Sequence, residues 1–432
     1  MIDTLLLWDW LELAIRWVHV ITAIAWIGSS FYFIALDLGL TKHAGLPPGA
    51  TGEEWQVHGG GFYHIQKYAV APENMPEHLT WFKWESYSTW LSGAALMAVM
   101  YWAGAELYLI DYDKIEWPVW AAIALSAGSI ALGWIVYDFL CKSRLGHRPT
   151  LMMLALFAII VVMSWALNQI FTGRAALLHL GAFTATIMSA NVFFIIIPNQ
   201  KIVVADLKAG RTPDPEYGRI AKLRSTHNNY LTLPVIFLML STHYPLAFGT
   251  EFAWVIAALV FLMGVSIRHF FNTMHARKGS PWYRWPWWTW APTAAVFAAL
   301  IALSTATTWD YPEDEAYTFV PERLQPAVAA DGFDEVRDVV LGRCAMCHAG
   351  VPAWPGIAVP PKGVMLETDA QIAAAAKDIF LQAGVSHAMP PGNITYMEPA
   401  ERAAIVAWFR SLSAPDAPSG APVAREEAAL RP

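Results

Sequence analysis

Residues 149–173, PTLMMLALFAIIVVMSWALNQIFTG, decide the fold because this long stretch contains no charged side chain. A helix needs about 20 consecutive apolar residues to cross the hydrocarbon core of a bilayer. Within lipid no water is present to hydrogen-bond the backbone, so a segment of this kind has to be helical. The stretch therefore predicts a membrane-spanning helix.

Seven further windows share this character, namely residues 17–36, 86–105, 117–137, 175–200, 225–250, 252–267 and 285–309. The whole chain is 56% hydrophobic and only 15% charged, and it contains 22 Trp. A water-soluble helical bundle would instead show polar residues at every third or fourth position. The sequence thus predicts an all-α fold, with a polytopic eight-helix transmembrane bundle over residues 1–310.

The charges between the windows predict how the bundle is oriented. Cytoplasmic loops of membrane proteins carry an excess of Lys and Arg. The loops after the third, fifth and seventh windows are cationic, with Lys142, Arg144, Arg148, Lys201, Lys208, Arg211, Arg219, Lys222, Arg224, Arg277, Lys278 and Arg284. The opposite loops are poor in cations, and only the first loop, at about 37–85, is mixed. We therefore expect a multi-pass protein of the bacterial inner membrane, with its N-terminus and C-terminal domain on the periplasmic side.

The composition changes after the last window. We expect a linker over residues 311–329, a small domain over 330–413 and a disordered Pro- and Ala-rich tail over 414–432. The domain contains Cys344-Ala-Met-Cys347-His348, which is the Cys-x-x-Cys-His signature of c-type haem attachment. In such a site the two thiols bond covalently to the haem and the histidine ligates the iron. The domain is therefore predicted to be a class I-type cytochrome c.

The second axial ligand has to come from elsewhere in this domain. Met389 lies in Ser386-His387-Ala388-Met389-Pro390-Pro391, and a Met/His pair raises the reduction potential of a haem. His387 is a rival ligand. Short helices are predicted over 333–342 and 399–412. A redox disulfide, or half of a zinc site, is the alternative use of the two cysteines. The adjacent histidine and the later Met-Pro favour haem c, and the only other cysteine, Cys141, lies at the end of a membrane helix.

Ionisable side chains inside membrane segments are functional candidates by default. Four histidines of the windows are candidate ligands of a haem b or another metal: His19, His179, His243 and His269. The alternative for each is a hydrogen-bonded core histidine. An internal cofactor that relays electrons is needed only if the electron donor binds on the cytoplasmic side, because ~30 Å of hydrocarbon would then separate the donor from the periplasmic haem.

The sixth window is the most polar. It opens with Arg224-Ser225-Thr226-His227-Asn228-Asn229-Tyr230, which places hydrogen-bonding groups beside aromatic faces, as a planar heterocycle requires. Glu85, at the start of the second window, is expected to face the same inner cavity. The candidate catalytic residues are thus Arg224, His227, Asn228 and Glu85. The alternative is an ordinary helix end capped by Ser, Thr and Asn.

A resemblance enters at this point. With Trp17-Val18-His19, Trp26-Ile27-Gly28, the stretch 224–230, Thr242-His243-Tyr244-Pro245 and the motif 344–348, the chain resembles bacterial membrane-bound urate oxidases (urate hydroxylases) fused to a cytochrome c. The resemblance covers essentially the whole chain. The haem motif is specific for a cytochrome, and the membrane stretches point to the urate family. The first of these stretches also resembles the first helix of small membrane haem b proteins.

The resemblance implies oxidation of urate to 5-hydroxyisourate, with water as the oxygen source. Electrons would pass through haem c to a soluble cytochrome c or a terminal oxidase, without release of hydrogen peroxide. It also implies Arg224 or Arg268 as a cation for the urate anion and His227 as a base. Soluble urate oxidases have another fold, so none of their residues can be transferred. No nucleic-acid partner is expected.

Three other functions are compatible with the same sequence. A quinol-oxidising dehydrogenase that feeds cytochrome c is the main alternative. A membrane-anchored electron carrier needs only one helix, and a transporter with a haem sensor would take up its substrate without reducing the haem.

Overall fold

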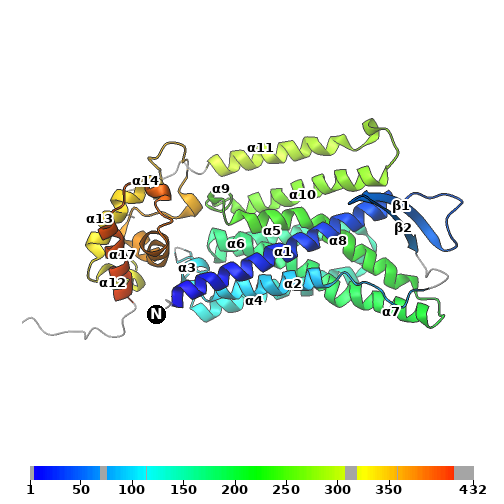
Figure 1. Ribbon diagram of the computed structural model, residues 1–432, viewed down its shortest axis with the longest axis horizontal. Coiled ribbons are helices and arrows are strands. Elements are labelled where there is room, and N and C mark those ends of the chain that lie inside the picture. The colour runs from blue at the N-terminus through cyan, green and yellow to red at the C-terminus, as the bar shows by residue number, and fades with distance from the viewer. Residues whose placement is uncertain (1–3, 69–74, 113, 307–318, 358, 413–432) are drawn as a thin grey trace, which may run out of the picture. The chain divides into compact units, whose positions relative to one another are not determined.

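The computed structural model describes residues 4–68, 75–112, 114–306, 319–357 and 359–412. The chain forms two compact units, Met1–Asp310 and Tyr311–Pro432. Figure 1 shows the long helices of the first unit and the short helices of the second.

The first unit is built from helices and one hairpin. Its helical elements are α1 (Thr4–Gly39), α2 (Trp84–Leu96), the π-helical η1 (Met97–Trp102), α3 (Ala105–Tyr108), α4 (Val119–Lys142), η2 (Arg144–His147), α5 (Pro149–Ile170), α6 (Gly173–Ala190), the π-helical η3 (Asn191–Ile196), α7 (Ile197–Lys208), α8 (Pro215–Ser241), α9 (Pro245–Phe248), α10 (Ala253–Ala276), η4 (Trp282–Arg284), η5 (Trp287–Thr289) and α11 (Trp290–Ala306).

Six helices in the described part of the chain are long and apolar enough to cross a membrane: Leu6–Gly39, Val119–Lys142, Pro149–Ile170, Gly173–Lys208, Ala253–Ala276 and Trp287–Thr305. This falls short of the eight predicted. Window 86–105 forms the short α2 followed by η1. Window 225–250 forms part of α8, which ends at Ser241 and is followed by a break before α9. Both windows carry too many polar groups or interruptions to pass as uniform apolar helices.

Small residues allow the helices to approach closely, as is common where membrane helices pack. A Cβ atom at Gly133 of α4 would lie 2.6 Å from the Phe183 ring of α6. A Cβ atom at Gly264 of α10 would lie 2.6 Å from Cδ of Pro234 in α8. Helix α6 is buried along most of its length and contacts α4, α5 and α8. The core of the unit therefore lies around α6 and α8.

The all-α prediction is wrong for the first loop, which contains an antiparallel hairpin. Strands β1 (Ala50–His58) and β2 (Gly61–Tyr68) pair in antiparallel register, and the last residue pair before the turn is His58 with Gly61. Gly59 and Gly60 form the two-residue turn with φ of 59° and 80°. Positive φ at both central residues is what a type I′ hairpin turn requires, and glycine adopts it without strain. Gly59 and Gly60 thus have a turn-forming role.

The second unit contains η7 (Glu322–Leu324), α12 (Gln325–Val328), α13 (Phe333–Arg343), α14 (Ala345–His348), η8 (Pro361–Gly363), α15 (Asp369–Ala374), α16 (Ala376–Ile379), the π-helical η9 (Phe380–Val385), η10 (Pro391–Asn393) and α17 (Pro399–Ser411). The helices predicted over 333–342 and 399–412 are confirmed as α13 and α17. They pack through Phe333 and Trp408, whose ring centres are 5.7 Å apart.

The predicted linker at 311–329 is partly folded. Within it, α12 packs on the core of the second unit, and the Trp408 indole donates to the Ala327 carbonyl at 3.1 Å. Residues 311–318 and the predicted tail at 414–432 lie outside the described residues. The packed unit therefore begins earlier in the chain than residue 330.

Candidate functional site

Arg224 is buried on α8 and is held by an ion pair and a hydrogen bond. One of its Nη atoms donates to Asp138 of α4 at 2.7 Å, and the other donates to Oδ1 of Asn191 at 3.1 Å. Its guanidinium also lies over the Tyr137 ring, 4.9 Å from the ring centre. The positive charge of Arg224 is therefore already balanced by a carboxylate of the protein.

His227 and Asn228 belong to the same buried network. The Tyr137 hydroxyl lies 2.8 Å from His227 Nδ1, and Asn191 Nδ2 donates to Oδ1 of Asn228 at 2.8 Å and to the Tyr137 hydroxyl at 3.1 Å. His227 Nε2 is buried and has no hydrogen-bond partner among the described residues. When Nδ1 donates to Tyr137, Nε2 carries the lone pair and can accept a proton.

The structure thus joins three of the four candidate catalytic residues and adds three that the sequence analysis missed. Tyr137, Asp138 and Asn191 complete the network around Arg224, His227 and Asn228. Asp138 had a detectable signal, since it is an acidic residue just after an apolar window. Its pairing with α8 depends on which helices are neighbours, which the sequence did not show.

Glu85 is not connected to this network by any contact of the described residues. It lies in the first turn of α2, and its Oε2 atom is buried without a hydrogen-bond partner. The following residue, Ser86, lies 3.3 Å from Ser189 of α6. Glu85 is therefore a separate, half-buried acid.

A second polar cluster lies where α8 meets α10. Arg268 Nη2 donates to Oδ1 of Asn272 at 3.0 Å, and Asn272 Nδ2 donates to Oδ1 of Asn229 at 2.9 Å. The Arg268 guanidinium carbon lies 4.2 Å from the centre of the Phe31 ring of α1. This cluster contains Arg268, the second cation considered above.

The four candidate histidine ligands have different surroundings. His179 has partners at both ring nitrogens: Ala175 O lies 2.7 Å from Nδ1 and Ser126 Oγ lies 2.6 Å from Nε2. His179 therefore matches the alternative of a hydrogen-bonded core histidine. His243 is exposed in the turn after α8, and Nδ1 of His269 lies 3.3 Å from the Tyr230 hydroxyl.

His19 differs from these because it packs against a glycine. Its Nδ1 lies 3.0 Å from Thr89 O and 3.1 Å from Ser92 Oγ, and a Cβ atom at Gly93 would lie 2.9 Å from its Cε1. Its Nε2 has no hydrogen bond among the described contacts. Within the described ranges, no group of three or more His, Cys, Asp or Glu side chains is placed to hold a metal ion.

The haem motif of the second unit has a geometry that fits a c-type haem. Cys344 and Cys347 are free, half-buried thiols, and α14 carries His348 one turn beyond Cys344. His348 Nδ1 lies 2.8 Å from the Val364 carbonyl, which orients the ring and leaves Nε2 free for iron. Burial raises the pKa of the Cys344 thiol to about 11, so the free cysteine is protonated at neutral pH.

Met389 is better placed than His387 to be the second axial ligand. Met389 packs against the core that also contacts Cys344, whereas His387 is exposed and has a positive φ of 55°. Arg402 Nη1 donates to the Met389 carbonyl at 2.9 Å, and its Nη2 donates to Oδ1 of Asn393 at 3.2 Å. The Met389 loop is thus held by the last helix.

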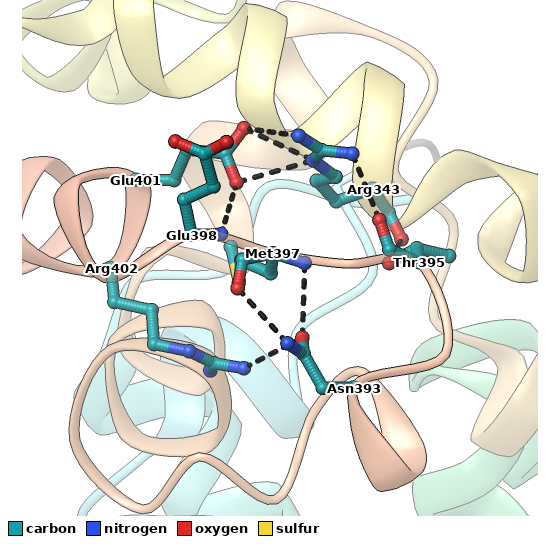
Figure 2. Close-up of polar contacts among 7 residues, drawn as sticks. All are labelled: Arg343, Asn393, Thr395, Met397, Glu398, Glu401 and Arg402. Atoms are coloured by element: carbon teal, nitrogen blue, oxygen red, sulfur yellow. Dashed lines mark hydrogen bonds and ion pairs between the residues drawn. The ribbon is translucent and has the colours of Figure 1, made fainter.

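Figure 2 shows the polar contacts of Arg343, which precedes the haem motif, and of Asn393 and Arg402, which follow the Met389 loop. Arg343, directly before Cys344, forms an ion pair with Glu401 at 2.9 Å and donates to the Thr395 carbonyl at 2.8 Å. Asn393 donates to the Met397 carbonyl at 3.1 Å. The motif and the methionine loop are therefore both fixed to α17.

The comparisons with known proteins identify one family. The model of the family described as urate oxidase N-terminal matches residues 5–304. This range covers nearly all of the first unit, which is called the helical unit below. No curated protein and no solved structure matches the chain.

Proposed function

Because the chain belongs to the urate oxidase N-terminal family, we propose that it is a membrane-embedded oxidoreductase that oxidises urate to 5-hydroxyisourate. Urate and one water give 5-hydroxyisourate, two protons and two electrons. A haem held by Cys344, Cys347 and His348 in the second unit would supply the outlet through which the electrons reach a soluble cytochrome c or a terminal oxidase. Because oxygen is not the direct acceptor, no hydrogen peroxide forms.

One observation carries the proposal. The family match covers the helical unit, and the same chain continues into a Cys-x-x-Cys-His motif whose histidine has Nε2 free. A unit that oxidises urate releases electrons and needs an acceptor for them, and a haem c in the same chain would be that acceptor. When bound, the haem would supply a one-electron acceptor, and Met389 and His348 as its ligands would favour a high potential.

The buried network on α8 supplies groups for the proton chemistry. We assign His227 Nε2 as a base for protons released in the oxidation, because it is a buried polar atom of that network without a partner among the described residues. Tyr137 orients the His227 ring through Nδ1. Arg224 and Asn228 position Asn191, and through it Tyr137, so their roles are those of positioning residues. Glu85 is a second, separate candidate proton acceptor.

The topology proposed here places the helical unit in the bacterial inner membrane. The six long apolar helices support membrane insertion. We propose that α2 with η1, and α8, complete an eight-helix bundle around the polar networks, since polar helices are tolerated where they face the bundle interior. The loop cations support our proposal that the N-terminus and the haem c unit lie on the periplasmic side.

A haem b in the helical unit is a further proposal, and His19 is its best-supported ligand. Its Nε2 is available, whereas both nitrogens of His179 are engaged. A pyridine haemochrome spectrum of the purified protein tests this. A b-type signal that is lost in His19→Ala and kept in His179→Ala supports the assignment, and a purely c-type spectrum contradicts it.

The oxidation itself is tested by adding urate to purified holoprotein under argon. Since each urate releases two electrons and each haem c accepts one, one urate should reduce two protein molecules. Cys344→Ala/Cys347→Ala protein should bind no covalent haem and should fail to consume urate with external cytochrome c. Reduction of the haem by a quinol but not by urate would contradict the proposal and favour a quinol dehydrogenase.

A further inference from the structure

Arg268 is a buried cation without a carboxylate partner. The residue is 7% exposed, and no salt bridge of the described residues involves it. Charged side chains are almost never buried unless they are paired. Arg224 follows that rule through Asp138, whereas the contacts of Arg268 among the described residues are with Asn272 and the Phe31 ring. Among the described residues, its charge is thus left without a counter-charge.

The unpartnered atoms around Arg268 are hydrogen-bond donors. Arg268 Nε and Asn229 Nδ2 are both buried without a partner, and Asn229 is 0% exposed. An unsatisfied buried donor typically costs about as much as a lost hydrogen bond. Two free N–H groups beside a free positive charge match a ligand that carries acceptor atoms and a negative charge.

The cluster also has the form that a flat ligand needs. The Phe31 ring lies 4.2 Å from the guanidinium carbon, and Asn272 links Arg268 to Asn229 across α10 and α8. Gly264, one turn before Arg268, lets α10 approach Pro234 of α8 closely. Pro234 has no N–H, so the Tyr230 carbonyl lacks its helical partner as well. The planar guanidinium of Arg268, the ring of Phe31 and the amide of Asn229 thus come from three helices, α10, α1 and α8.

We propose that Arg268, Asn229 and Phe31 form the binding site for the urate anion, an assignment that rests on the proposed function. Urate is flat, carries one negative charge at neutral pH and presents carbonyl oxygens along its edges. Arg268 would pair with this anion, Asn229 Nδ2 would donate to a carbonyl oxygen, and the Phe31 ring, over which the guanidinium lies, would hold Arg268 in place for this pairing. A cation already neutralised by Asp138, as Arg224 is, would bind the anion less well.

A polar cavity elsewhere in the helical unit lacks these properties. A cavity of about 460 Å³ opens among residues that include Asp111, Lys114, Asn168 and Glu251. Its lysine is already paired with Asp111 at 2.9 Å and donates to the Phe171 carbonyl at 2.9 Å. That cavity is therefore less suited to a planar anion.

The test is equilibrium binding of radiolabelled urate to holoprotein whose haem has been reduced with dithionite under argon, so that no turnover occurs. Arg268→Gln should weaken binding about 10- to 100-fold, the effect of losing a charge-assisted hydrogen bond. Arg219→Gln, which removes an exposed guanidinium paired with Glu216 at the start of α8, is the matched control and should bind like wild type.

Thermal unfolding separates a ligand-binding role from a structural one. A buried charge without a partner destabilises the ligand-free protein, so Arg268→Gln should have an equal or higher Tm without urate. Urate should raise the Tm of wild type and not that of the variant. A lower Tm in Arg268→Gln with unchanged urate binding would overturn the site.

Phe31→Leu gives a second variant that keeps an apolar side chain on α1. It should also weaken urate binding, and wild-type affinity in both Phe31→Leu and Arg268→Gln would overturn the site while leaving the proposed function intact. Wild-type protein that neither binds urate nor is reduced by it would overturn the proposed function and the site together.

Discussion

The Arg224 guanidinium on α8 donates to an Asp138 carboxylate oxygen on α4 at 2.7 Å, and the Arg224 side chain is only 3% exposed. The other oxygen of Asp138 lies 2.6 Å from Lys142. One carboxylate thus serves a buried cation and a surface cation. It connects the candidate proton-transfer network of α8 to the end of α4.

Replacing Asp138 by Asn should destabilise the protein strongly. The substitution leaves Arg224 buried without a counter-charge, which typically costs roughly 3 kcal/mol. Chemical denaturation of the detergent-solubilised protein measures the change. Asp206→Asn, which breaks the exposed pair with Arg211, is the control and should cost less than about 1 kcal/mol. Equal losses in the two variants would contradict a neutralising role for Asp138.

Replacing His227 by Gln should lower the rate of urate-dependent haem reduction by about 10²- to 10⁴-fold, the usual contribution of a general base. The KM for urate should change little, because the proposed anion site is formed by other residues. Stopped-flow absorbance of the haem gives both parameters. His58→Gln, on the exposed end of β1, is the control for loss of an imidazole.

Tyr137→Phe should act through His227. The change removes the hydroxyl that lies 2.8 Å from Nδ1 and keeps the ring beneath Arg224. We expect a smaller loss of rate than in His227→Gln and a changed pH dependence of kcat, because the orientation and proton affinity of the imidazole both change. Equal rates and pH profiles for Tyr137→Phe and wild type would show that the hydroxyl does not position the base.

Met389→Leu should lower the reduction potential of the haem, because the soft sixth ligand that stabilises the reduced iron is lost. His387→Leu removes an exposed side chain two residues away and should leave the potential unchanged. Redox titration of the two purified variants compares them directly. The opposite pattern would make His387 the ligand.

The hairpin should lose stability in acid through Glu53. Hydrogen bonds from His43 and His64 lower the pKa of Glu53 to about 2 from its usual value of 4.5. Between these values the unfolded chain binds more protons than the folded hairpin, so stability falls as the pH drops from about 4.5 to 2. Amide hydrogen exchange of β1 and β2 measures this. In Glu53→Gln this pH dependence of hairpin stability should disappear. If the variant loses stability in acid as steeply as wild type, the pH dependence belongs to another group.

The features that depend on local chemistry could be predicted from the sequence. The apolar stretch 149–173 became α5 over Pro149–Ile170, and the pattern after Gly332 became α13. The hairpin was missed because the first loop was judged by its mixed charge rather than by its alternating residues around Gly59 and Gly60. The break after Ser241 was missed because a hydrophobic window averages over a helix end.

The networks inside the bundle were less predictable, because they depend on which helix faces pack together. His227 and Arg224 were identified as polar residues in an apolar setting, yet their partners Tyr137 and Asp138 come from a helix about 90 residues earlier. The sequence predicts His179 as a candidate ligand, but Ser126 of another helix lies beside its Nε2. Conversely, Arg268 has no carboxylate partner among the described residues, a property that likewise depends on how the helices pack.

The π-helical segment η3 has a consequence for how this chain can change in length. An α-helix turns about 100° per residue, and a π turn contains one residue more than an α turn. Asn191, at the start of η3, faces Arg224, and Ile197, just after η3, is buried. Deleting one residue between 192 and 196 would convert η3 to a regular turn and keep both flanking segments in phase, whereas the same deletion within α5 would rotate every later side chain to a new face. The continuous helix of α6, η3 and α7 thus has one position where a single-codon deletion can be accommodated.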